Sequence, residues 1–226
     1  MRFEQALRLK PEHVEARHNL GITLIQQGRV PEAVGHLEQV LRLRPGDAET
    51  GNNLGLALVQ LGDSLAAQGK WIEAMAQYAQ AVQASPDNAP AHDGLGFALS
   101  RAGQPAEAVE QYRKALAIDP RLATAQNHLA WLLATATDPA IRNVEEAVRW
   151  AERACELTTN SVAGYLDTLG VAYAEAGRFV EAGQAAERAA TTALATGDKN
   201  LAAQIQSRLE LYRAGRAYHG GAASTP

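Results

Sequence analysis

The chain has 226 residues, a formal net charge of −4 and 46% hydrophobic residues, of which few are aromatic. This slight acidic balance excludes a general nucleic-acid binder, because such a protein needs a basic surface to neutralise phosphates. A single cysteine, Cys155, excludes an internal disulfide and a cysteine-based metal site. No stretch approaches the ~18 consecutive apolar residues of a membrane span. Since no secretory signal is found at the start either, we expect no direct membrane insertion and favour a cytoplasmic location.

Prolines recur at a fixed spacing along the chain. Pro11 and Pro45 are 34 residues apart, and so are Pro86 and Pro120. Between Pro45 and Pro86 the spacing is seven residues longer. Because seven residues make about two helical turns, an insertion of that size keeps the same helical face. A repeat of this length points to stacked supersecondary units.

The same kinds of residue recur within each period. A leucine followed by a small residue appears as Leu20-Gly21, Leu54-Gly55, Leu95-Gly96, Leu129-Ala130 and Leu169-Gly170. Later in each period an alanine opens a second apolar run, at Ala33, Ala74, Ala108, Ala147 and Ala182. Glycine inside a helix costs about 1 kcal/mol relative to alanine, so its repeated use needs a packing reason. We expect these glycines to lie where two helices cross closely.

The first ten residues, Met1 to Lys10, match only the second helix of a unit. Phe3, Ala6 and Leu7 form its apolar side, and Pro11 ends it. Since the first helix of that unit is missing, this face would lack a partner. We therefore expect Phe3 and Leu7 to form an assembly surface, or the chain to continue a longer parent protein upstream of Met1; a frayed end without consequence is the alternative.

The insertion falls in the second full unit. Its first helix is expected to run unbroken from about Ala48 to Gln68, with a break near Gly62-Asp63 as the alternative. Further along, Asn143 followed by Glu146 predicts an N-cap with a capping box. The last helix, from about Lys199 to Ala214, carries one apolar stripe, and its remaining polar side chains, Arg208 among them, are expected to face outward as in a terminal cap.

The pattern resembles the tetratricopeptide repeat (TPR), a 34-residue helix–turn–helix. The resemblance implies an all-α fold, a right-handed α-solenoid of antiparallel helix pairs with a C-terminal capping helix. The units are a half repeat at 1–11, repeats at 12–45, 46–86 (with the insertion), 87–120, 121–159 (with a longer inter-helix loop) and 160–197, a capping helix at 198–214 and a flexible tail at 215–226. Residues 123–219 also resemble a bacterial C-terminal TPR module that closes larger proteins, including membrane glycosyltransferases.

Catalytic and metal-binding patterns are missing from the sequence. The six histidines include no pair at the i, i+4 spacing that zinc motifs use on a helix. The glycines form no phosphate-binding loop, and Glu145-Glu146 fits compensation of a helix dipole better than a catalytic pair. We therefore predict a protein that is not an enzyme and needs no cofactor or metal.

The TPR resemblance implies that the first helix of each pair lines a concave groove. The groove positions it gives here are Asn19, Ile22, Gln26, Asn53, Leu56, Gln60, Phe97, Arg101, His128, Trp131 and Thr135. Asparagines at such positions form a ladder for extended peptides in the TPR domain of O-GlcNAc transferase, although Gly94 interrupts the series here. Phe97 and Trp131 would be neighbouring anchors, since aromatic residues dominate interface hot spots; the alternative is that both belong partly to the core.

These features predict a scaffold whose partner is a protein or peptide held in the concave groove. Two alternatives stay open. The chain would be a structural subunit that assembles into a larger complex or oligomer through its ends, or it would be the regulatory tail of a larger protein, of the membrane glycosyltransferase kind.

Overall fold

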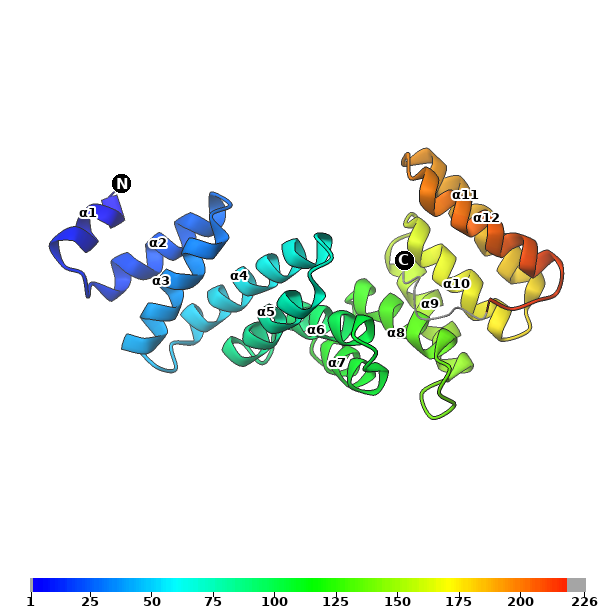
Figure 1. The fold of residues 1–226 in the computed structure, drawn as a ribbon, viewed down its shortest axis with the longest axis horizontal. Coiled ribbons are helices and arrows are strands. Elements are labelled where there is room, and N and C mark those ends of the chain that lie inside the picture. Colours follow the sequence, from blue (N-terminus) through cyan, green and yellow to red (C-terminus); the bar gives the residue numbers. More distant parts are fainter. Residues whose placement is uncertain (1, 219–226) are drawn as a thin grey trace. The chain divides into compact units, whose positions relative to one another are not determined.

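The computed structural model describes residues 2–218, so that His219 and the predicted tail beyond it lie outside the described residues. The described part of the chain is helical throughout and contains no strand (Figure 1). Its twelve helices are α1 Arg2–Leu9, α2 Val14–Gln26, α3 Val30–Leu43, α4 Ala48–Ala67, α5 Trp71–Ala84, α6 Ala89–Arg101, α7 Pro105–Ile118, α8 Ala123–Thr135, α9 Val144–Leu157, α10 Ala163–Glu175, α11 Phe179–Ala195 and α12 Lys199–Arg213.

The helices form two compact units, whose boundary falls inside α6. Unit 1 reaches to Ala98 and unit 2 begins at Leu99. In unit 1, α2 packs on α3 and α4 packs on α5; in unit 2, α8 packs on α9 and α10 packs on α11, which α12 covers. Each unit has its own core, made largely of alanine and leucine.

Short turns join the helices of a pair. Gly28 and Gly69 follow α2 and α4 at φ of 74°, a left-handed conformation that glycine adopts without steric cost. After α9, where the terminal proline of the repeat is absent, Thr159 and Asn160 take the left-handed conformation instead, at φ of 50° and 55°. Side chains cap the starts of α2, α4, α9 and α12; the Asp47 carboxylate before α4, for example, accepts a hydrogen bond from the Thr50 backbone N–H at 3.0 Å.

The repeated small residues lie at close helix crossings, as the sequence predicts. A Cβ placed on Gly21 of α2 would come within 2.8 Å of the Leu37 side chain on α3. One placed on Gly170 of α10 would lie 3.3 Å from the Ala182 carbonyl oxygen on α11. Both distances are shorter than ordinary van der Waals contact, so a side chain at these positions would push the paired helices apart.

Helix α4 is continuous over its 20 residues, and the alternative of a break near Gly62-Asp63 is wrong. Gly62 faces the Tyr78 ring of α5, and a Cβ there would come within 2.6 Å of Cε1. The Tyr78 hydroxyl donates a hydrogen bond to Asp63 Oδ1 at 2.7 Å. Gly62 therefore makes room for a buried tyrosine that ties the insertion to the next helix.

Helix α1 is not left without a partner, contrary to the expectation from the missing helix. Leu7 packs against a small core formed by Leu20, Leu24 and Ala33. Phe3, one turn earlier, is 37% exposed. The half repeat thus uses one side of its apolar face on α2 and leaves Phe3 at the surface.

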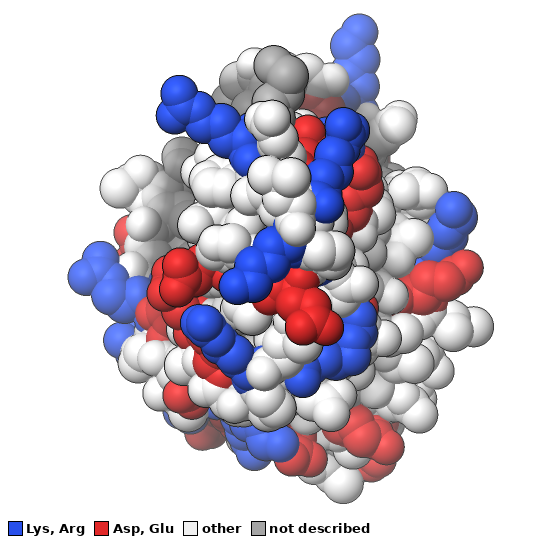
Figure 2. Space-filling view, turned by 90° about the vertical axis from the view of Figure 1, so that its left-hand side faces the viewer, with Lys and Arg blue, Asp and Glu red and all other residues white. Residues whose placement is uncertain are grey.

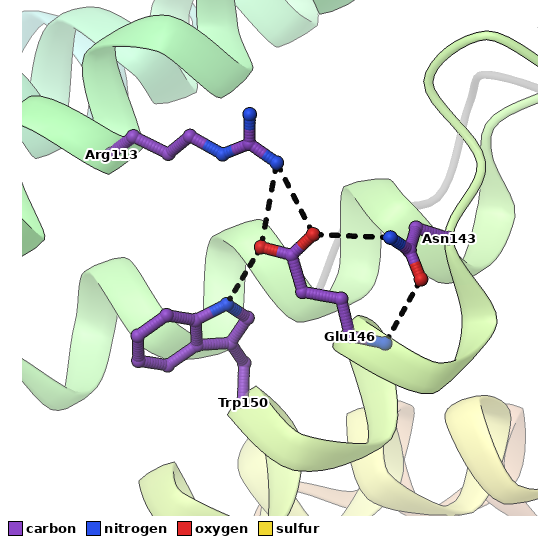
Figure 3. Close-up of polar contacts among 4 residues, drawn as sticks. All are labelled: Arg113, Asn143, Glu146 and Trp150. Carbon is purple, nitrogen blue, oxygen red and sulfur yellow. Dashed lines mark hydrogen bonds and ion pairs between the residues drawn. The ribbon is translucent and has the colours of Figure 1, made fainter.

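Polar contacts at the start of α9 connect this helix to α7 of unit 2 (Figure 3). The Asn143 side chain caps the helix by accepting from the Glu146 backbone N–H at 3.1 Å, as predicted. The capping box is different from the expected one, because the Glu146 carboxylate accepts from the Asn143 side-chain amide instead of the backbone. It also accepts from Trp150 Nε1 at 3.2 Å and pairs with Arg113 of α7 at 3.2 Å. Glu146 therefore joins α7 to α9.

The single cysteine, Cys155, belongs to the core of unit 2 and is 1% exposed. Burial raises the pKa of its thiol from 9.0 to about 11. Because only the thiolate attacks disulfides, and burial disfavours the thiolate and shields the sulfur, we expect the native chain to react with Ellman's reagent at pH 8 far more slowly than the denatured chain. Equal rates in buffer and in denaturant would contradict this placement.

Candidate functional site

The most open set of predicted groove positions lies on α2 and α4 of unit 1. Leu56 is an apolar side chain that is 48% exposed, and Ile22 is half-buried at the equivalent position of α2. Asn19 and Asn53 stand one turn before them on their helices, and the exposed Gln26 and Gln60 stand one turn after them. We call these six residues the α2–α4 face.

Contacts between the two helices hold this face in place. His18 Nδ1 lies 2.8 Å from Thr50 Oγ1, and its Nε2 lies 3.6 Å from a carboxylate oxygen of Glu49. Within residues 2–218, by contrast, neither the Asn19 nor the Asn53 side chain hydrogen-bonds another protein group. An amide side chain carries two donors and an acceptor, so both asparagines keep their full capacity for a ligand.

Helix α6 supplies the next predicted position, Phe97. Its ring is half-buried and meets Trp71 of α5 edge to face, with 5.6 Å between ring centroids. The preceding turn holds Gly94, where a Cβ would come within 2.4 Å of the Tyr78 ring. Gly94 interrupts the asparagine series for this reason, since the buried tyrosine occupies the space of any side chain. Arg101, half-buried, belongs to unit 2.

The equivalent positions of α8 and α10 in unit 2 are closed. Trp131 is only 6% exposed, and the Tyr218 ring lies over it with 6.2 Å between centroids. Val171 and Thr168 of α10 are fully buried. Trp131 is therefore not an exposed side chain; its indole packs in the core of unit 2, the alternative that the sequence left open. We call Trp131, Thr168 and Val171 the α8–α10 face.

The two other predicted residues of α8 also make intramolecular contacts. His128 is half-buried, with its ring tilted against Tyr112 of α7 at 5.7 Å. Thr135 Oγ1 donates to the Trp131 carbonyl oxygen at 2.8 Å, which closes the last turn of the helix. Neither side chain has the exposure of Leu56.

A buried ion pair beside this face was missed in the sequence. Arg208 of α12 is 4% exposed and Asp167 of α10 is fully buried. The guanidinium donates through Nε to Oδ1 at 2.9 Å and through Nη2 to Oδ2 at 2.6 Å, a bidentate arrangement. Burial raises the pKa of the Asp167 carboxyl, and the Arg208 guanidinium opposes that rise. The prediction that Arg208 faces outward as part of a polar cap is wrong.

The position of Arg208 in the sequence indicates that its side chain is buried. Arg208 follows Ile205 by three residues and precedes Tyr212 by four, which places it in the apolar stripe of α12. A cation in such a stripe requires a buried anion on the helix that it packs against.

Comparisons with known proteins agree with this architecture. The tetratricopeptide repeat family matches residues 12–87, 48–121, 94–162 and 163–188. The chain belongs to the tetratricopeptide repeat family. Proteins of the TPR class act in protein–protein interaction and are in general non-enzymatic scaffolds. A search of curated protein sequences found no significant match.

Solved TPR structures share the fold. YrrB, described as a TPR protein with an unusual peptide-binding site, is 18% identical, with a TM-score of 0.64 over 91% of this chain and 97% of its own. MamA is 18% identical, with a TM-score of 0.57 over 84% and 96%. A thermophilic TPR protein of Thermus thermophilus, TTC0263, is 20% identical, with a TM-score of 0.50 over 86% and 97%. At these identities the likeness shows an all-α TPR solenoid fold.

Charges are mixed on the TPR surface. Figure 2 shows basic and acidic side chains interspersed on the face that it presents, without a large area of one sign. In the described part of the chain, no three histidine, cysteine or acidic side chains gather as a metal site would require. Among the same residues, no helix has the length and apolar character needed to cross a bilayer.

Proposed function

We propose that this TPR protein binds an extended peptide segment of a partner protein along the α2–α4 face. The observation that carries the proposal is the half-exposed Leu56, flanked by two asparagine side chains that hydrogen-bond no protein group among residues 2–218. Removing an exposed apolar side chain from water favours binding, and the asparagine amides fix the orientation of the ligand through hydrogen bonds.

Peptide backbone fits this arrangement chemically. Each residue of an extended segment presents one N–H donor and one C=O acceptor, and an asparagine side chain meets both. Asn19 and Asn53 lie on neighbouring helices, so that they would hold two points of one backbone. Ile22 and Leu56 would then favour an apolar side chain between those points. The description of YrrB, which shares this fold, as having a peptide-binding site supports a peptide as the class of partner.

Selection from a random peptide library against the full chain, followed by affinity measurements on the peptides obtained, tests the proposal. Leu56→Glu is expected to weaken binding about tenfold or more, which corresponds to ~1.4 kcal/mol, because it places a charge where an apolar side chain is desolvated. Asn53→Ala is expected to cost about 0.5–1.5 kcal/mol, the usual worth of one net hydrogen bond.

Ile72→Glu is the matched control. Ile72 is an apolar residue on α5 of the same unit and is 77% exposed, so its replacement removes a surface side chain from a helix that does not contribute to the α2–α4 face. Its binding is expected to equal that of the wild type. The proposal would be contradicted if Leu56→Glu and Ile72→Glu weakened peptide binding equally, or if the selection enriched no peptide.

A second candidate, assembly through α1, is favoured by Phe3, whose ring is 37% exposed at the end of unit 1. It predicts that the chain self-associates and that Phe3→Ala abolishes the association. Sedimentation velocity over a range of concentrations measures this directly. If the chain stayed monomeric at every concentration, self-association through α1 would be contradicted.

A further inference from the structure

The segment that follows α12 turns back onto unit 2. Gly215, at φ of 66°, ends the helix, and the Arg216 N–H donates to the Leu211 carbonyl oxygen at 2.9 Å. This pairing is typical of a glycine-terminated helix whose chain then reverses direction. Residues 216–218 have no regular secondary structure, and Figure 1 shows the chain bending back after α12.

The reversal places the Tyr218 ring in a site formed by Trp131 of α8, Asp167 of α10 and Arg208 of α12, which we call the seat of Tyr218. Its half-buried ring packs on the core of unit 2, tilted by 50° against Trp131 of α8. The Arg208 guanidinium of α12 lies 5.2 Å from the centroid of the Tyr218 ring. Contacts of both kinds are favourable for an aromatic ring, since aromatic pairs prefer tilted geometry and cations attract the ring face.

The seat is held together without Tyr218. Asp167 of α10 fixes the Arg208 guanidinium by two hydrogen bonds. The Trp131 carbonyl accepts from Thr135, and the helix around it is buried in the core of unit 2. Tyr212, which is 2% exposed, has a hydroxyl with no hydrogen-bond partner within the described residues.

We propose that the seat of Tyr218, formed by Trp131 of α8 and the Asp167–Arg208 pair of α10 and α12, is a second peptide site, specific for a tyrosine or phenylalanine side chain, and that Tyr218 occupies it as an intramolecular ligand. In the closed state the Tyr218 ring packs on Trp131; a partner segment with an aromatic residue displaces Tyr218 and takes its place. The inference rests on the proposed function in so far as the chain binds peptides. It adds the chemistry of the partner side chain and a means of regulation.

Competition with Tyr218, which is tethered to its own site, sets the apparent affinity of the chain for an outside peptide. A segment joined to its site by a short connection acts at an effective concentration in the millimolar range. A partner therefore binds with an affinity reduced by the fraction of molecules in which the tail is released. Removing the Tyr218 ring should raise that fraction and strengthen binding of an outside aromatic peptide.

The test uses the full chain with Trp71→Phe and Trp150→Phe, so that Trp131 is the only indole. Tyr218→Ala is expected to raise the acrylamide quenching constant of Trp131 about threefold, because the contact that excludes water from the indole is lost. The matched control is Tyr173→Ala. It removes another half-buried tyrosine, whose hydroxyl donates a hydrogen bond to Glu152 of α9. It should leave the quenching constant unchanged.

A synthetic peptide with the sequence of residues 213–218 (RAGRAY) then replaces the tail in trans. It is expected to restore protection of Trp131 in the Tyr218→Ala chain and to bind it about tenfold more tightly than the wild type. The same peptide ending in alanine should do neither. Unchanged quenching in Tyr218→Ala, or equal peptide affinity for both chains, would overturn the inference.

Loss of cooperative folding in Tyr218→Ala would also overturn it, because a segment that can be released does not hold the fold together. Failure here is distinct from failure of the proposed function. The quenching test reports on unit 2 and needs no outside partner, whereas the Leu56→Glu series reports on unit 1.

Discussion

Asp167→Ala is expected to lower the free energy of unfolding of unit 2 by about 3–5 kcal/mol. The substitution leaves the Arg208 guanidinium buried, at 4% exposure, without its anion. Removing one partner of a buried pair lowers stability by more than the pair itself contributes, because the remaining charge stays desolvated without a counter-ion. Guanidinium denaturation followed by tryptophan fluorescence measures the loss.

The matched control is an ion pair of the same chemistry at the surface. Glu187 and Arg213 join α11 to α12 at 2.9 Å, and their side chains are 56% and 59% exposed. Glu187→Ala should change stability by less than about 1 kcal/mol, since water solvates both ions when the pair is broken. Similar losses for the two substitutions would contradict the assignment of Asp167–Arg208 as a buried pair.

Replacing both partners by apolar residues separates charge from packing. Asp167→Leu together with Arg208→Met should recover most of the stability lost in Asp167→Ala, because no unpaired charge remains. It should also weaken the seat of Tyr218, since the cation beside the ring is gone. A double variant as unstable as the single one would mean that the shape of the two side chains, and not their charge, is what the core requires.

Gly94→Leu is expected to destabilise unit 1 by about 3 kcal/mol, the upper part of the range for overpacking. A Cβ at this position comes within 2.4 Å of Tyr78 Cε1, and the ring cannot move toward α4, where Gly62 already lies against it. The tyrosine hydroxyl is further fixed by Asp63. Either the ring leaves its pocket or α6 moves away from α5.

Gly35→Leu serves as the control. Gly35 is a helical glycine on α3 of the same unit, exposed, with no atom within 4 Å of an added Cβ. This change should be neutral or stabilising by up to about 1 kcal/mol, because leucine is the better helix former. The opposite signs of the two substitutions are the readout. A destabilisation of similar size at both positions would contradict the packing of Tyr78 between α4 and α6.

Much of the fold was predictable because each unit is specified locally. The 34-residue spacing of prolines and small residues indicated the helix pairs, and the heptad-sized insertion before Trp71 indicated a long α4. Gly21 and Gly170 were predicted at crossings, and added Cβ atoms would indeed contact the paired helices. In a repeat protein most contacts are made between neighbours in the sequence, so local pattern carries most of the information.

Exposure at the candidate site was less predictable. Leu56 and Trp131 hold equivalent positions in the repeat, yet they are 48% and 6% exposed. Trp131 belongs to the core cluster of unit 2 and also contacts Tyr218, a residue outside the repeats that has no place in the periodic pattern. Arg208 of the capping helix and Asp167 of the last repeat are 41 residues apart. The first contact depends on the return of the chain after α12 and the second on the packing of α12 against α10, and periodicity encodes neither.

The two faces suggest a division of roles within the proposed function. In the proposal the α2–α4 face, with an exposed apolar residue and asparagine amides that have no partner among the described residues, binds directly. The seat of Tyr218 beside Trp131 would bind only after the chain's own tyrosine is released. A partner with an apolar and an aromatic segment would then gain affinity from both, if its connecting length allows simultaneous contact.

The most direct test of the central claim observes the asparagine side chains themselves. In a ¹H–¹⁵N spectrum of the full chain, titration with a selected peptide should shift the side-chain amide resonances of Asn19 and Asn53, together with backbone amides around Leu56. Shifts at these amides, absent in the titration of Leu56→Glu, are the result expected for a peptide held along α2 and α4. Shifts confined to α3 and α5, around Val34 or Ile72, with both asparagine side chains unmoved, would contradict it.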